Sequence, residues 1–138
     1  MMKKYFNNKN GNQKVVYGKG KGKKYSDVSR ETENMFYAWL AYAGIEEDEF
    51  YKRISRKPCK IVENINTNGD IEINIFAGFS QVIVPLVWQK NGSSSLDDFL
   101  VNVLLIFSYV AARLEDKNFE KAVTVFADRM IEERKMTL

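Results

Sequence analysis

Residues 99–112 form an almost unbroken apolar run, and this run limits the possible folds more than any other part of the chain. Apolar residues recur on one helical face, and Val101, Leu105 and Ile106 extend the apolar surface to the opposite face. A helix that is apolar nearly all round is either a buried core helix or a membrane span. The run covers 14 residues and includes Asn102, whereas a span needs about 20 apolar residues. We therefore predict a core helix, or one half-buried in a partner, in a chain that does not enter a membrane.

The sequence also marks the ends of this helix and predicts a partner for it. Ser95 is the expected N-cap, because Asp98 three residues later completes a capping-box spacing. After a short turn, Asn118 is the expected cap of a second helix. The inner stripe of that second helix comprises Phe119, Ala122, Val123, Phe126, Met130 and Ile131. Since the connection is short, we expect the two helices to pack antiparallel, with Leu104 in the core.

Two shorter helices are expected in the first half of the chain. Ser26 or Ser29 begins the first one, which runs to about Tyr42 and ends at Gly44. The second opens with the acidic residues 46–49 and closes with basic residues. This order complements the helix dipole, so it also offers a purely structural reason for both charge clusters.

The middle of the chain changes to the alternating pattern of strands. Segments 59–65 and 71–76 flank Asn68-Gly69, a strong signal for a two-residue hairpin turn. If those two residues occupy the centre of the turn, Val62 pairs with Ile75. The same register places Val62 on the face that packs against the helices.

Residues 81–88 are the candidate for a third strand, and their Pro85 indicates an edge strand or a bulge. The resulting order is helix, helix, strands, helix, helix. This order predicts an α+β fold in which four helices pack on one face of a small antiparallel sheet of about three strands. We expect residues 25–138 to form a single domain of this kind.

The charge of the chain is divided unevenly. Residues 1–24 contain eight lysines and no acidic residue. Residues 25–138 hold the other 13 of the 21 Lys and Arg residues against all 18 Asp and Glu residues, so an arm of +8 precedes a body of −5. Because an arm rich in Lys, Asn and Gly buries too little surface to offset its ordering entropy, we expect it to be mobile.

Lysines spaced along a flexible chain neutralise phosphates without reading base sequence. Aromatic residues interleaved with them are typical of proteins that hold single strands by stacking. We therefore expect non-specific binding of single-stranded DNA or RNA by the arm, with a second cationic segment after the second helix. The expected binding residues are Lys14, Tyr17, Lys19, Lys21, Lys23, Lys24 and Tyr25 in the arm, and Lys52, Arg53, Arg56, Lys57 and Lys60 in the second segment. The simpler alternatives are a solubilising tail and a solvated helix face.

The residue types most used in catalysis are scarce. The chain has no histidine and a single cysteine, Cys59, which excludes Cys/His zinc sites and a Cys–His nucleophile pair. The Gly- and Lys-rich segment 18–24 does not fit the spacing of a phosphate-binding loop. We therefore expect no enzymatic activity, no metal and no cofactor.

An alternative function is a protein-binding inhibitor, adaptor or assembly module of the kind found in phages and mobile elements. Large apolar residues on the third strand and on both faces of the central helix favour an interface, and we expect the protein to form a homo-oligomer whichever function it has. The other interpretation of these residues is a thicker single core. One cysteine and no apolar run near Met1 predict a cytoplasmic protein.

Overall fold

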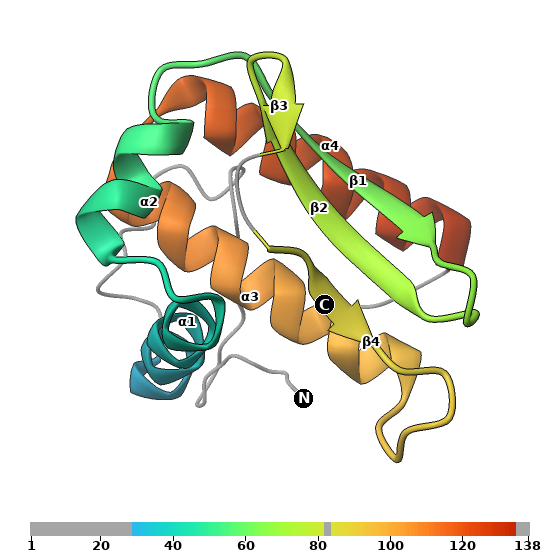
Figure 1. Ribbon diagram of the computed structural model, residues 1–138. Helices are drawn as coiled ribbons and strands as arrows, with labels where there is room; N and C mark the ends of the chain where they lie inside the picture. The colour runs from blue at the N-terminus through green and yellow to red at the C-terminus, as the bar shows by residue number, and fades with distance from the viewer. Residues whose placement is uncertain (1–28, 82–83, 135–138) are drawn as a thin grey trace.

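The fold is α+β, as the sequence predicts, with four helices and a small antiparallel sheet (Figure 1). The computed structural model describes residues 29–81 and 84–134. In chain order the elements are α1 (Arg30–Ala43), α2 (Glu47–Ile54), β1 (Cys59–Ile65), β2 (Ile71–Ala77), β3 (Ser80–Gln81), β4 (Leu86–Trp88), α3 (Leu96–Leu114) and α4 (Lys117–Arg134).

Helix α3 lies at the centre of the molecule. It runs antiparallel to α4, and the pair covers one face of the sheet, while α1 and α2 flank α3 on the side away from β1 (Figure 1). Leu104, Ile106 and Tyr109 point in different directions around α3, yet they are only 2%, 5% and 1% exposed. The apolar surface all round α3 is therefore covered within the domain, which supports the thicker core. No helix in the described part of the chain has the length and apolar character to cross a membrane.

The helix ends agree with the predicted caps except at α4. The Ser95 hydroxyl accepts a hydrogen bond from the Asp98 N–H (3.1 Å), and Ser29 caps α1 in the same way. At α4, however, the cap is Asp116 and not Asn118. The Asp116 carboxylate accepts from the N–H groups of Asn118 (2.9 Å) and Phe119 (3.3 Å), because the helix begins earlier than predicted.

The inner face of α4 is otherwise as predicted. Its buried residues are Phe119, Ala122, Val123, Phe126, Ala127 and Met130. Ile131 does not belong to this stripe, because 36% of it is exposed.

The predicted register of the β1–β2 hairpin is wrong by one residue. Ile61, not Val62, is opposite Ile75. The cause is the turn, in which the Asn66 side chain accepts from the N–H groups of Asn68 (2.9 Å) and Asp70 (3.0 Å). With Gly69 in the left-handed region (φ +85°), the loop is longer than the two residues predicted.

Because of this one-residue shift, the side chains of β1 that are predicted to face the helices point to the opposite face of the sheet. The side chains of β2 face the helices as predicted. Ile61 is 4% exposed and packs into the core with Ile71, Ile73 and Ile75 of β2. The same shift turns Glu63 toward the helices, where it forms an ion pair with Arg134 at the end of α4. Lys60, Val62, Asn74 and Phe76 consequently lie on the face that no described helix covers (Figure 1).

The third strand is an interrupted edge strand, consistent with Pro85. Both β3 and β4 pair with the edge of β2 that β1 leaves free. Gln81 lies opposite Phe76 and Leu86 lies opposite Ile73. Four residues of the sequence therefore separate the two pairs on this strand, whereas two separate them on β2.

A polar cluster joins α1, α2 and α3. The Arg113 guanidinium donates to the hydroxyls of Tyr109 (2.8 Å) and Tyr37 (2.9 Å) and forms an ion pair with Glu47 (3.0 Å). Burial raises the pKa of the Tyr109 phenol, so it remains a neutral hydrogen-bonding group at ordinary pH. The cluster fixes the position of α1 relative to the central helix.

Candidate nucleic-acid interface

The structure describes five of the twelve residues expected to bind nucleic acid. The arm residues Lys14, Tyr17, Lys19, Lys21, Lys23, Lys24 and Tyr25 lie outside the described residues. The other five, Lys52, Arg53, Arg56, Lys57 and Lys60, are all exposed, and we refer to them as the cationic segment. They follow one another from the last turn of α2 through the loop into β1.

One cation of this segment forms an ion pair with an acidic side chain. Arg53 forms an ion pair with Glu49, one helical turn earlier, at 3.1 Å. Their side chains are 43% and 48% exposed, so the pair is screened by solvent and contributes little to stability. The Arg53 guanidinium therefore remains at the surface beside Lys52.

The loop after α2 is held in place by a buried carboxylate. Arg56 adopts a left-handed backbone conformation (φ +58°) that only a minority of non-glycine residues show. Its backbone N–H donates to Asp116, the same side chain that caps α4. Asp116 is 8% exposed, so it fixes the turn that presents Arg56 and Lys57 to solvent.

The C-terminal end of the cationic segment lies beside two phenylalanines, Phe76 and Phe79. The Gly78 N–H donates to the Pro58 carbonyl (2.7 Å), which places the β2–β3 turn against the residue after Lys57. At this turn Phe79 is fully exposed. Lys60 is the register partner of Phe76 on the open face of the sheet. Cations and aromatic rings are thus adjacent at this end of the sheet.

Sequence reasoning does not connect these phenylalanines with the cationic segment. Phe79 is 22 residues from Lys57, and in the sequence it belongs to the large apolar residues that favour a protein interface. Its neighbour Gly78, with φ +71°, is the local signal for a turn that displays the next side chain. The hydrogen bond to Pro58 has no signature in the sequence.

The acidic residue on the open face lies away from this end. Glu72 is four residues before Phe76 on β2, which places it about 13 Å along the strand. Its carboxylate accepts a hydrogen bond from the Asn66 amide (3.2 Å). The cationic segment and Phe79 therefore face solvent, with Phe76 half-buried beside them, and no acidic residue lies between them on the described strands of the sheet.

Cys59 opens β1 beside the cationic segment and has the properties of a packing residue. Burial, with a smaller effect of the Asp116 charge, raises the pKa of its thiol to about 12. At neutral pH the thiol is protonated and is a poor nucleophile. Among residues 29–81 and 84–134, no three His, Cys, Asp or Glu side chains gather in an arrangement that holds a metal ion.

No protein-family model matches this chain, and neither a curated protein nor a solved structure is similar to it.

Proposed function

We propose that this protein binds single-stranded DNA or RNA without sequence preference. The observation that carries the proposal is the contact between Gly78 and Pro58, which brings exposed Phe79 next to the cationic segment. Single strands are held by cations that track the phosphates and by aromatic rings that stack on bases. Both kinds of group occur here within one end of the sheet.

In this proposal each side chain has a distinct role. Phe79 has its whole ring in solvent, so it offers a stacking surface for an unpaired base. Lys57 and Lys60 flank the two phenylalanines and contact phosphates on either side of a stacked base. None of these side chains presents the paired donors and acceptors that read a base edge, which is why the binding is non-specific.

The arm supplies the long-range attraction. Residues 25–138 carry a formal charge of −5, so the body as a whole repels a polyanion. The eight lysines in residues 1–24 reverse this effect. We therefore propose that the arm captures the strand and that the cationic segment with Phe79 holds it.

The test is fluorescence anisotropy of a labelled oligothymidine and a labelled oligouridine over a range of salt concentrations. Phe79→Ala should weaken binding by about 1–3 kcal/mol, or roughly 5- to 150-fold, with the salt dependence unchanged. A variant that combines Lys57→Ala with Lys60→Ala should have a shallower slope of log K against log salt. The magnitude of this negative slope should fall by about 0.7 for each phosphate that is no longer neutralised. Deletion of residues 1–24 should remove most of the binding.

Matched control variants are available on other surfaces. Val125→Ala removes an apolar side chain that is 53% exposed on α4, and Lys121→Ala removes an exposed lysine of the same helix. Both should leave binding unchanged. A full-length protein that binds neither oligonucleotide at low salt would refute the proposal, and equal losses for Phe79→Ala and Val125→Ala would refute the assigned surface.

A further inference from the structure

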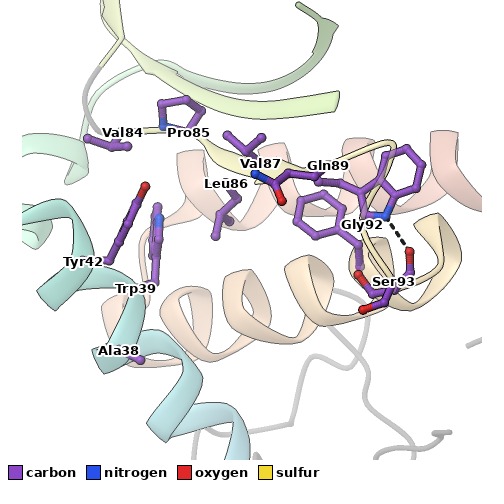
Figure 2. Close-up of a pocket in the computed structure, with 13 residues that line it drawn as sticks. Ala38, Trp39, Tyr42, Val84, Pro85, Leu86, Val87, Gln89, Gly92 and Ser93 are labelled. Atoms are coloured by element: carbon purple, nitrogen blue, oxygen red, sulfur yellow. Dashed lines mark hydrogen bonds between the residues drawn. The ribbon is translucent and has the colours of Figure 1, made fainter. Parts of the chain in front are cut away.

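A groove lies between the edge of the sheet and α1, on the far side of β4 from β2. It has a volume of about 700 Å³. Figure 2 shows Trp39 and Tyr42 rising from α1 on one side, with the segment from Val84 to Val87 on the other. Phe99 of α3 also lines it. None of its lining residues is charged.

The wall formed by β4 has a free edge. Residues Leu86–Trp88 pair with β2 and, within the described part of the chain, with no other strand. Leu86 and Trp88 lie opposite the inward-facing Ile73 and Ile71, whereas Val87 is 43% exposed. An unpaired edge with apolar side chains is the kind of surface to which an extended segment adds as a further strand.

The opposite wall contains a hydrogen-bond donor to which residues 29–81 and 84–134 offer no acceptor. This donor is the indole N–H of Trp39, a side chain that is only 7% exposed. In Figure 2 its ring extends from α1 toward Pro85 and Leu86. A buried indole N–H normally has a partner. Because this nitrogen has almost no accessible surface, a backbone carbonyl of a strand seated between α1 and β4 reaches it after a small shift of the groove walls.

We propose that the groove binds the chain's own segment Val15-Val16-Tyr17 as an additional strand on the edge of β4. This is the longest apolar run in residues 1–28, and it is uncharged like the groove. Its β-branched and aromatic residues favour an extended backbone. The proposal does not depend on nucleic-acid binding.

The length of chain before α1 allows this placement. The groove begins at Ala38, eight residues into α1, or about 12 Å along the helix at about 1.5 Å per residue. Residues 18–28 connect the apolar run to the start of α1, and when extended they span up to about 36 Å. The connection is therefore about three times as long as the helical path from the start of α1 to the groove.

Amide hydrogen exchange of the full-length protein, followed by NMR, tests the proposal. We expect the amides of Tyr17 and Val87 and the indole N–H of Trp39 to exchange at least about tenfold faster when the apolar run is interrupted by Val16→Lys, because the added strand is then released from the groove. Asn12→Lys is the matched control, because it adds the same charge to the same arm outside the apolar run. It should leave these rates unchanged.

Two results would overturn the proposal. One is exchange of the Val16 and Tyr17 amides in the wild type at the rate of an unstructured peptide. The other is protection that weakens on dilution together with a solution mass twice that of the chain, which would assign the groove to a second copy. A Trp39→Phe variant, which removes the indole N–H and retains an aromatic ring, should speed exchange at Val16 and Tyr17.

Discussion

Replacement of Asp116 tests the contact that joins the cationic loop to the helix pair. In the Asp116→Ala variant, α4 loses its N-cap, which costs about 0.5–2 kcal/mol. The Arg56 N–H, whose bond to Asp116 is part-buried, also loses its acceptor, at a cost of up to about 3 kcal/mol. Since both groups depend on one carboxylate that is 8% exposed, we expect Asp116→Ala to lower the free energy of unfolding by about 2–4 kcal/mol.

Two further variants separate the roles of the two carboxylate oxygens. Asn is as good an N-cap as Asp, so Asp116→Asn keeps the cap of α4 but offers its amide nitrogen to the Arg56 N–H. We expect this variant to lose about half as much as Asp116→Ala, roughly 1–2 kcal/mol. Asn118→Ala alters the exposed residue that the sequence alone suggests as the cap, and it should change stability by less than about 0.5 kcal/mol.

Urea unfolding followed by circular dichroism at equilibrium provides the measurement, with the slope m compared among the variants. The order expected is Asp116→Ala, then Asp116→Asn, then Asn118→Ala, from the largest loss to the smallest. Equal losses for Asp116→Ala and Asn118→Ala would show that Asp116 is not the cap. A loss below about 0.5 kcal/mol for Asp116→Ala would show that the contact with Arg56 adds nothing to stability.

Two other predictions follow from the packing. Leu104→Ala should lower the free energy of unfolding by about 2–5 kcal/mol, because truncation of a side chain only 2% exposed leaves a cavity, whereas Val125→Ala, at a position 53% exposed, should have little effect in the same urea titration. Cys59, with a pKa of about 12, should react with iodoacetamide at pH 8 at least about a hundredfold more slowly in the folded protein than in urea, and equal rates would contradict its burial. Because its folded pKa is raised, this thiol contributes stability that is present below about pH 9 and is lost as the pH rises toward 12.

The sequence predicts most of the fold because the signals for helices and strands are local. The caps Ser29 and Ser95 are recognisable because a cap and the N–H it binds are three residues apart. The hairpin register is not, because Asn68-Gly69 suits a two-residue turn and only the bonds made by Asn66 select the longer loop. For the same reason the inward position of Glu63 does not emerge from the sequence.

The candidate sites depend on contacts between distant parts of the chain. The cationic segment is visible in the sequence because its residues are neighbours. Its proximity to Phe79 rests on the bond from Gly78 to Pro58, and no pattern along the chain encodes that distance. The groove is even less accessible to sequence reasoning, since its walls come from α1, β4 and α3.

The cluster that joins α1 to α3 has a consequence for synthesis on the ribosome. Tyr37 hydrogen-bonds with Tyr109, a residue 72 positions later in the chain. At about 5–20 residues per second, α3 is completed roughly 4–14 seconds after α1. In the folded protein Phe36 is fully buried and contacts the rings of Phe50 and Tyr51 in α2 and of Tyr109 in α3. During that interval only the two rings of α2 have been synthesised. Until the central helix emerges, the aromatic face of α1 in the nascent chain therefore lacks its partner on α3.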